Sequence, residues 1–280
     1  MAMVGRAIYG DGRADTLRRA AFDDTIYGGG AEASPNHLGD AIHGGSRNDI
    51  LFGNGGDDRL FGERGNDAVY GGSGNDSASG GLGNDTVHGN EGSDVLRGED
   101  GDDVLYGGSV QADPLDSADS IYGGAGNDTV FGDGGNDLIA GGLGADALYG
   151  GGGADTFRFG QTLTRRFDAI DQGTRTTVEL DSTVLFGNTG DSIFGFEASD
   201  RIDLSDIDAD ARGWLEVNYS VNDRFNYIGA ADFTDVGQVR VSRLQGDTVV
   251  EANTAPGLAA ELRIVLVGYT GPVGPENKFF

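Results

Sequence analysis

Apolar residues recur every nine positions through the first half of the chain, and the residues around them are mostly small or polar. Between Gly44 and Tyr106 this period is unbroken over seven nonapeptides, which read GGSRNDILF, GNGGDDRLF, GERGNDAVY, GGSGNDSAS, GGLGNDTVH, GNEGSDVLR and GEDGDDVLY. Each unit has glycine at position 1, aspartate at position 6 and an apolar residue at position 8. Because side chains alternate along a strand, positions 7 to 9 predict a short strand whose middle residue points inward.

The same register extends in both directions, and sixteen units fit between Met1 and Arg158. Two of them, Gly28–His43 and Gly107–Tyr122, are lengthened to 16 residues by insertions near 29–38 and 109–116. The predicted inward-facing residues are Ile42, Leu51, Leu60, Val69, Val87, Leu96, Leu105, Ile121, Val130, Ile139, Leu148 and Phe157.

One unit supplies one turn and one strand, so two units complete a coil and successive units fall on opposite sides of a flattened roll. Strands that stack at ~4.8 Å would make this roll about 38 Å long. The sequence therefore predicts an all-β fold, with a right-handed parallel β-roll over residues 1–158.

After Arg158 the nine-residue pattern ends, and alternating apolar and polar residues predict ordinary strands separated by turns: TTVEL, TVLF, WLEVNY, QVRVSRL, DTVVEA and ELRIVLVGY. We expect a hairpin within Thr162–Gly190. Residues 159–280 are predicted to form a β-rich C-terminal cap that covers the open end of the roll and nucleates its folding.

The net charge of the chain indicates a need for divalent cations, which the hydrophobic pattern alone does not indicate. The chain has 280 residues, 52 of them glycine, and 46 acidic against 19 basic residues give a net charge of −27. Such a chain repels nucleic acid and anionic membranes and attracts divalent cations. Carboxylate repulsion and the entropy of glycine predict that the repeats are largely unfolded without such cations.

Several other classes of site and location are excluded or disfavoured. The absence of cysteine excludes disulfides, thiolate zinc sites and cysteine nucleophiles. The chain contains no apolar run of the ~18 residues that a membrane-spanning helix needs. The beginning of the chain lacks the apolar core of a secretory signal peptide.

The nonapeptide resembles the RTX repeat, the calcium-binding β-roll repeat GGxGxDxUx. That resemblance implies several Ca²⁺ ions, each lying between one turn and the turn two units later and sharing their aspartates. It implies one row of Asp49, Asp67, Asp85 and Asp103, and another of Asp58, Asp76 and Asp94, then Asp128 and Asp146. We expect sites that involve Asp40 or Asp119, in the lengthened units, to be altered or lost.

The predicted calcium ligands combine carboxylates with the carbonyls of turn glycines, which are hard oxygen donors of the kind that Ca²⁺ prefers. They are Gly44, Asp49, Gly53, Gly55, Asp58, Gly62, Asp67, Gly71, Gly72, Gly74, Asp76, Gly80, Gly81, Gly83, Asp85, Gly89, Asp94, Gly98, Asp103, Asp119, Gly123, Gly124, Gly126, Asp128, Gly132, Asp137, Gly141, Gly142, Gly144, Asp146 and Asp155.

Two further resemblances concern location. DSIFGFEASDRIDLSDID, at Asp191–Asp208, resembles the serralysin-type C-terminal region of secreted metalloproteases, and ENKFF resembles the short hydrophobic tails of type I secretion substrates. They imply export of the unfolded chain by type I secretion machinery and an extracellular location. In size and layout the chain is similar to the small secreted NodO-type nodulation proteins.

No catalytic motif accompanies the repeats. The three histidines, His37, His43 and His88, do not form HExxH, and neither a GxSxG elbow nor a phosphate loop is present. We therefore predict a non-enzymatic secreted calcium-binding protein that is folded by extracellular Ca²⁺. Two alternatives stay open: the C-terminal RTX and secretion domain of an enzyme such as a metalloprotease or alginate epimerase, and a membrane-active RTX protein.

Surface features suggest where a host surface, polysaccharide or membrane would bind. The insertions, Glu32–Leu38 and Val110–Asp116, are predicted to protrude from one edge of the roll, either as a binding edge or as neutral insertions. The aromatic residues at position 9 suggest a contact stripe or, as we favour, ladders that stabilise the strands. Their distribution over both faces predicts no continuous platform. They are Tyr27, Phe52, Phe61, Tyr70, Tyr106, Tyr122, Phe131 and Tyr149.

Overall fold

The fold is taken from a computed structural model of the 280-residue chain. It describes residues 7–11, 13, 15–18, 22–29, 38–108 and 117–160, followed by 166–170, 173–177, 192–194, 201–206, 226–227, 238–245, 247–253, 262–267 and 269. Every regular element among these residues is a β-strand, so the all-β prediction is confirmed. No helix in the described part of the chain is long and apolar enough to cross a membrane.

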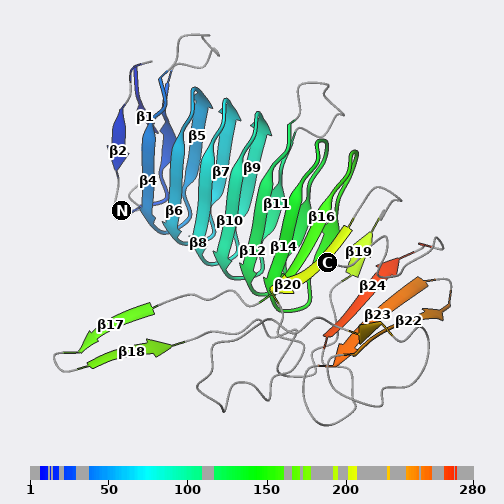
Figure 1. Ribbon diagram of the computed structural model, residues 1–280. Coiled ribbons are helices and arrows are strands. Elements are labelled where there is room, and N and C mark those ends of the chain that lie inside the picture. The colour runs from blue at the N-terminus through cyan, green and yellow to red at the C-terminus, as the bar shows by residue number, and fades with distance from the viewer. Residues whose placement is uncertain are drawn as a thin grey trace.

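The repeats form two stacks of parallel strands that face each other across the roll (Figure 1). Odd-numbered strands start sheet A: β1 (Ala7–Tyr9), β3 (Thr25–Tyr27), β5 (Ile50–Gly55), β7 (Ala68–Ser73), β9 (Thr86–Glu91), β11 (Val104–Tyr106), β13 (Thr129–Phe131) and β15 (Ala147–Tyr149). Even-numbered strands start sheet B: β2 (Thr16–Arg18), β4 (Ala41–Ser46), β6 (Arg59–Arg64), β8 (Ser77–Leu82), β10 (Val95–Asp100), β12 (Ser120–Ala125), β14 (Leu138–Leu143) and β16 (Thr156–Gly160).

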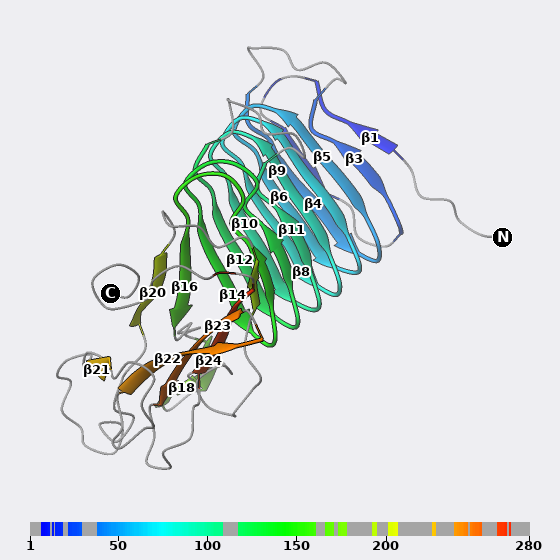
Figure 2. The same ribbon diagram turned by 90° about the vertical axis from the view of Figure 1, so that its right-hand side faces the viewer.

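The core between the sheets is a double column of position-8 side chains. All twelve predicted inward residues are fully buried, together with Ile26 and Ala78. Their neighbours at positions 7 and 9 are half-buried or exposed, as the alternation of side chains along a strand requires. Consecutive strands lie on opposite sides of the roll (Figure 2). Each unit contributes one apolar side chain to the core, so the core is filled from both sides.

The insertions do not disturb the register. Thr25 pairs with Ile50 and Val95 with Ser120, which are 25 residues apart, whereas regular neighbours such as Ile50 and Ala68 are 18 apart. The seven extra residues are therefore accommodated outside the strands. The predicted protruding edge at Glu32–Leu38 and Val110–Asp116 lies, except for Leu38, outside the described residues.

The C-terminal region continues both sheets before it changes architecture. Strand β19 (Ser192–Phe194) pairs in parallel with β15, and β20 (Arg201–Asp206) pairs in parallel with β16. Strand β24 (Leu262–Val267) then joins β19, and β23 (Asp247–Asn253) and β22 (Gln238–Leu244) extend sheet A as an antiparallel meander. Strand β21 (Asn226–Tyr227) ends that sheet.

The strands expected at QVRVSRL, DTVVEA and ELRIVLVGY are confirmed as β22, β23 and β24. The hairpin expected within Thr162–Gly190 is confirmed as β17 (Arg166–Ile170) paired with β18 (Gly173–Thr177). The predicted strand TTVEL overlaps only the end of β18, and TVLF and WLEVNY lie outside the described residues.

The prediction that the aromatic residues form no continuous row was wrong. Eight rings from sheet A stack in one line, with centroids 4.5–4.9 Å apart and planes within 17° of parallel. The lengthened units preserve the odd and even order, which places Tyr106, Phe131 and Tyr149 in the same sheet. We call this row the ring ladder: Tyr9, Tyr27, Phe52, Tyr70, His88, Tyr106, Phe131 and Tyr149.

Candidate metal centres

The position-6 aspartates form two ladders of hydrogen bonds, one beside each sheet. In both, the carboxylate Oδ1 accepts the backbone N–H of the aspartate one coil earlier, at 2.6–3.0 Å. One ladder runs through Asp24, Asp49, Asp67, Asp85, Asp103, Asp128 and Asp146. The other runs through Asp15, Asp40, Asp58, Asp76, Asp94, Asp119, Asp137 and Asp155.

This arrangement corrects one prediction. Asp128 and Asp146 belong to the row of Asp103, because the N–H of Asp103 bonds to Asp128 and not to a residue of the other row. The lengthened units do not interrupt the hydrogen-bond ladder, whereas the altered calcium sites expected at Asp40 and Asp119 stay a prediction, because the inserted residues lie outside the described part of the chain. Asp40 bonds the N–H of Asp15, and Asp119 bonds that of Asp94, both through Oδ1. A lengthened unit therefore counts as one unit, and its aspartate keeps its place.

The second carboxylate oxygen has a different environment. Seven of these aspartates are only 1–3% exposed, and their Oδ2 atoms are buried and accept no hydrogen bond. Burial of an oxygen that loses its water without gaining a partner is costly, and more so if it is charged. These seven residues are Asp49, Asp58, Asp67, Asp76, Asp85, Asp103 and Asp128.

A main-chain carbonyl lies beside six of these seven oxygens, next to the glycine at position 1. A Cβ added at Gly44 would lie 2.8 Å from Asp49 Oδ2 and 2.9 Å from the carbonyl oxygen of Gly62, one coil further on. Gly53, Gly62, Gly71, Gly98 and Gly123 show the same pair of oxygens at less than 3.0 Å. Position 1 is thus glycine because a carboxylate and a carbonyl already occupy the space of a side chain.

The glycines at positions 2 and 4 serve the turn. Gly72 and Gly74 adopt φ angles of 119° and 126°, and a Cβ at either would collide with the main chain of the previous coil. In the unit that begins at Gly53, the glycine with positive φ is Gly56 (99°), at position 4, and Gly55, named above as a calcium ligand, precedes it. Gly65, Gly92, Gly101 and Gly135, at position 4 of other units, also have positive φ.

Burial changes the acidity of these carboxyl groups. Desolvation is the main cause, the hydrogen bond from the neighbouring aspartate N–H partly opposes it, and repulsion from charged aspartates nearby adds to it. The pKa rises from 3.8 to about 6 for Asp49 and Asp67, to about 7 for Asp58, Asp85 and Asp103, and to about 8 for Asp76 and Asp128. The folded roll therefore favours a proton or a metal cation at these oxygens over a bare negative charge.

The chemistry of the donors fits calcium. No group of three or more histidine, cysteine, aspartate or glutamate side chains is gathered at one point in the described parts of the chain. The oxygens that do converge are one carboxylate and one main-chain carbonyl per unit, repeated along each ladder. Ca²⁺ accepts such mixed, hard oxygen ligands in a flexible geometry, whereas Zn²⁺ prefers nitrogen and sulfur.

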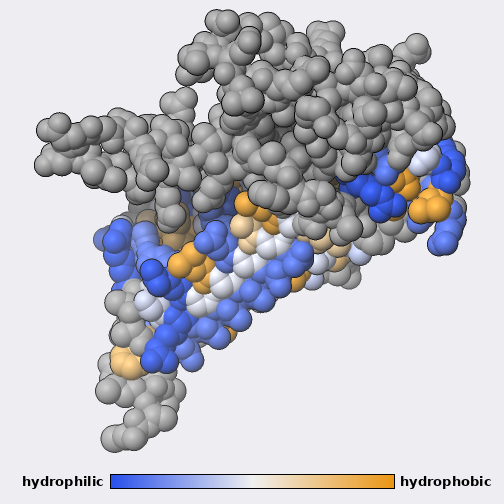
Figure 3. All heavy atoms as spheres, turned by 90° about the horizontal axis from the view of Figure 1, so that it is seen from below, coloured by the Kyte–Doolittle hydropathy of each residue, from blue (hydrophilic) through white to orange (hydrophobic). Residues whose placement is uncertain are grey.

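A second polar ladder, at position 5, lies outside the first. Asn48 Oδ1 accepts the N–H of Asn66, Asn66 Oδ1 accepts that of Asn84, and Asn84 Oδ1 accepts that of Asp102. Asp57 and Asn75 do the same at the other edge. Seen from below, hydrophilic bands run along the roll beside paler ones (Figure 3). These residues, for which the sequence pattern predicted no role, link the turns of successive coils by hydrogen bonds.

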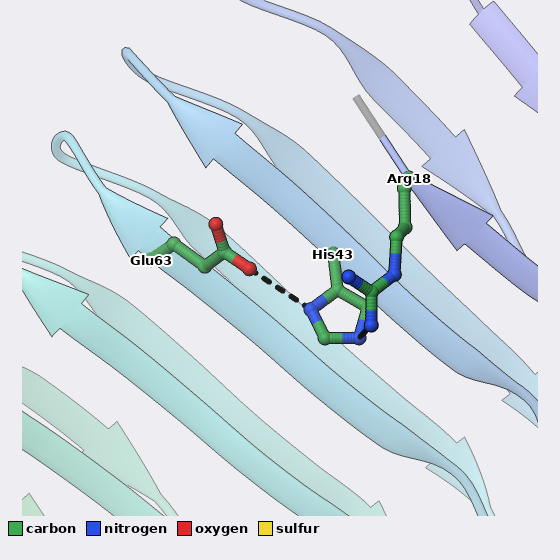
Figure 4. A network of polar contacts seen from close by, with 3 residues as sticks. All are labelled: Arg18, His43 and Glu63. Carbon is green, nitrogen blue, oxygen red and sulfur yellow. Dashed lines mark hydrogen bonds and ion pairs between the residues drawn. The ribbon is translucent and has the colours of Figure 1, made fainter. Parts of the chain in front are cut away.

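The two histidines in the described part of the chain, His43 and His88, lie on the outer faces of the sheets. His43 lies on the outer face of sheet B, where its Nδ1 meets Glu63 Oε1 at 2.9 Å and its Nε2 meets Arg18 Nη2 at 3.2 Å (Figure 4). Because a guanidinium only donates, Nε2 must be the acceptor and Nδ1 carries the proton. Both ring nitrogens are thus engaged by surface side chains. His88 belongs to the ring ladder, and His37 lies outside the described residues.

Comparison with known proteins agrees with this geometry. The family model "RTX calcium-binding nonapeptide repeat (4 copies)" matches residues 9–31, 43–78, 79–110, 115–139 and 131–161. A matching solved structure is the AlgE6R3 subunit of the mannuronan C5-epimerase of Azotobacter vinelandii, at 28% identity and a TM-score of 0.34, covering 63% of this chain and 73% of that one. No curated protein matches the chain.

Proposed function

Since the repeat region, residues 9–161, belongs to the RTX calcium-binding nonapeptide repeat family, we propose that this protein is a secreted calcium-binding protein whose roll folds only after export. Calcium-binding repeats of this kind, present in several copies, imply several Ca²⁺ ions. One observation carries the proposal. In these two rows, seven buried carboxylates present an oxygen without a hydrogen bond, and a main-chain carbonyl lies beside six of these oxygens.

The chain's own residues explain why the roll depends on a cation. Asp Oδ1 holds the main chain of the neighbouring coil, so each carboxylate is fixed in place. Its Oδ2 faces inward beside a carbonyl, where desolvation disfavours a bare charge. Bound calcium would supply positive charge at these oxygens. Because the donors converge only in the folded roll, the free energy of binding becomes free energy of folding.

Calcium concentration would then set where the chain folds. Extracellular calcium modules bind with dissociation constants of roughly 10⁻⁴–10⁻³ M, far above the calcium level inside cells. A chain with a net charge of −27 stays extended without cations, which suits export in an unfolded state. We propose a type I system as the route and the C-terminal segment Glu276–Phe280 as part of the signal.

We further propose that the protein acts without catalysis, at a host surface, polysaccharide or membrane, and does not bind nucleic acid. The matched repeats are a calcium-binding motif and not a catalytic one. The charge of the chain opposes contact with nucleic acid. Turnover of mannuronan or of a protein substrate by the purified calcium-loaded chain would contradict the first part of this proposal.

A calcium titration tests the central claim. Circular dichroism of the purified full chain should change from a disordered to a β spectrum as calcium rises through about 10⁻⁴–10⁻³ M, and calorimetry should show several bound ions. Magnesium at equal concentration is the matched control and should fold little of the chain, because it demands a tighter octahedron. A β spectrum that is unchanged by EDTA would refute the folding switch.

Secretion tests the location separately. Export from a host that carries a type I system should be lost when Glu276–Phe280 is deleted and kept when an equally short segment within residues 30–37 is deleted. Retention of both variants inside the cell, or export of both, would contradict the export proposal and would leave the calcium proposal unaffected.

A further inference from the structure

The two outer faces of the roll differ in charge. On sheet A, positions 7 and 9 of the repeat strands hold no aspartate, glutamate, lysine or arginine among the described residues. On sheet B the same positions hold Arg18, Arg59, Arg97 and Arg158. Two residues after position 9 both faces carry acidic residues: Asp11 and Asp133 on sheet A, and Glu63 and Glu99 on sheet B. Two uncharged rows, at positions 7 and 9, thus extend along sheet A in a chain with a net charge of −27.

These two rows, which we call the ladder face, lie side by side. The position-9 row is the ring ladder, which forms a ridge. The position-7 row, which we call the groove because its side chains are smaller, holds only alanine, threonine, valine and one isoleucine: Ala7, Thr25, Ile50, Ala68, Thr86, Val104, Thr129 and Ala147. Tyr9 and Ile50 are among the most exposed large apolar residues that the structure describes, at 66% and 40%.

The rings of the ladder cover one another. His88, for example, stacks between Tyr70 and Tyr106 at centroid distances of 4.8 and 4.5 Å. The rings also present their edges and not their faces, because each face is covered by the next ring in the stack. A sugar ring that stacks on aromatic faces would find them already occupied.

From this geometry we propose that the ladder face is an interface with a second copy of this chain, packed face to face as two sheets. Carboxylates repel one another over the rest of such an acidic molecule, so two copies approach most easily where the surface is uncharged. A two-fold axis parallel to the roll, between the two rows, would place the ridge of each copy in the groove of the other. Such an interface is isologous and closed.

The dimensions suit a small specific interface. Eight strands at ~4.8 Å spacing, with three to six residues at ~3.3 Å each, give a face of roughly 38 Å by 10–20 Å. That is on the order of 400–750 Å² per copy, against about 800 Å² per partner in standard interfaces. We therefore expect a reversible dimer that forms only when the roll is folded.

Sedimentation of the calcium-loaded full chain tests the dimer. The wild-type protein should pass from monomer to dimer over about 1–100 μM, the range of weak to moderate affinities. Thr86→Arg places a charge in the groove and should weaken the dimer at least about tenfold, because the charge must be desolvated at the interface. Ser120→Arg, at position 7 on sheet B, is the matched control and should leave the dimer unchanged.

Cross-linking supplies a second readout that does not need a destabilising charge. The chain has no cysteine, so any disulfide must come from the cysteine pair that is introduced. Under mild oxidation in calcium, the pair Ala68→Cys with Tyr70→Cys should give a covalent dimer, because position 7 of one copy faces position 9 of the other. The pair Ser77→Cys with Ser79→Cys, at the same positions on sheet B, should not. Circular dichroism establishes that all variants are folded.

Three results would overturn the proposal. They are a wild-type chain that is monomeric at about 100 μM, a dimer weakened equally by Thr86→Arg and Ser120→Arg, and equal cross-linking by both cysteine pairs. A monomer that co-sediments with phosphatidylcholine vesicles or with a polysaccharide, and loses this binding in Thr86→Arg, would assign the face to that partner. Because each measurement uses protein already shown to be folded, failure here leaves the calcium proposal intact.

Discussion

Sheet A continues from the roll into the antiparallel meander β22–β24, yet the interiors of the two regions differ. In the roll, fourteen aspartates are buried beside the apolar column, one for each unit from Asp24 to Asp155. In the described part of the meander the buried side chains are apolar except for Thr248, whose hydroxyl donates to the carbonyl of Tyr269 at 2.5 Å. The apolar residues there include Val249, Val250, Ile264 and Leu266.

This difference shows what each region needs in order to fold. The meander buries apolar surface and pairs its polar groups internally, which is the usual basis of stability. The roll obtains one apolar side chain from nine residues and must also bury a carboxylate. Its glycines lose more backbone entropy than other residues. We therefore expect folding of the roll to depend on a cation and folding of the meander to proceed without one.

Removal of calcium should give the largest separation between the two regions. With EDTA, amide protons of residues 41–160 should exchange rapidly, whereas those of β22–β24 should stay protected, as measured by hydrogen exchange with peptide resolution. With calcium, both segments should be protected. Simultaneous loss of protection in both would show instead that roll and meander form one cooperative unit.

Lowering the pH should partly replace calcium in the roll. Without the ion, folded-state pKa values of about 6 to 8 exceed the ordinary 3.8, so the folded roll binds more protons than the unfolded chain between these limits. Its stability is then fully present below about pH 4 and is lost as the pH rises through about 6 to 8.

Circular dichroism in EDTA should accordingly show more β structure at pH 5 than at pH 8. In excess calcium at pH 8 the β signal should be kept, because the ion takes the place of the protons. An ion-free chain whose β content is constant or rises between pH 5 and pH 8 would contradict the raised pKa values.

A single aspartate should matter locally. Asp76→Ala removes the acceptor of the Asp58 N–H and one buried oxygen, so in calcium it should cost about 1–3 kcal/mol of unfolding free energy and lower the number of bound ions. Coils far from Asp76 should keep their hydrogen-exchange protection, since each coil contacts only its neighbours.

Asp100→Ala is the matched control for Asp76→Ala. Asp100 is exposed at the end of β10, so its removal should change stability by less than about 0.5 kcal/mol and leave calcium stoichiometry unchanged. Equal effects of the two substitutions, measured by denaturation and calorimetry, would show that burial of the position-6 carboxylate is not what matters.

The smallest effect is expected in the meander. Arg263 Nε and Glu251 Oε1 are 3.7 Å apart on the partly exposed strands β24 and β23. Glu251→Gln should lower the free energy of unfolding by less than about 1 kcal/mol, with little dependence on calcium. The exposed variant Glu99→Gln in the roll is the control. If Glu251→Gln loses unfolding free energy in a calcium-dependent way and Glu99→Gln does not, the two regions are not energetically distinct.

The nine-residue pattern was enough to predict the roll. It identified twelve inward residues between Ile42 and Phe157 and placed aspartate before each strand. Both follow from the alternation of side chains along a strand and from the fixed length of the turn. It also contained a signal that was not used. The residue types of positions 6 to 9 recur at β19, as Asp-Ser-Ile-Phe, and at β20, as Asp-Arg-Ile-Asp. Both strands extend the roll in register.

Other features were decided only by the folded chain. Sequence spacing placed Asp128 in the wrong row and divided the aromatic residues between faces, because a lengthened unit shifts the residue count without shifting the strand order. The sequence by itself determined which residue types recur and therefore which side chain points inward. The tertiary structure alone decided which coils are neighbours, which carboxylate oxygen is engaged and which stays bare, and that eight rings form one ladder. These depend on contacts 18 or 25 residues apart, which local pattern does not encode.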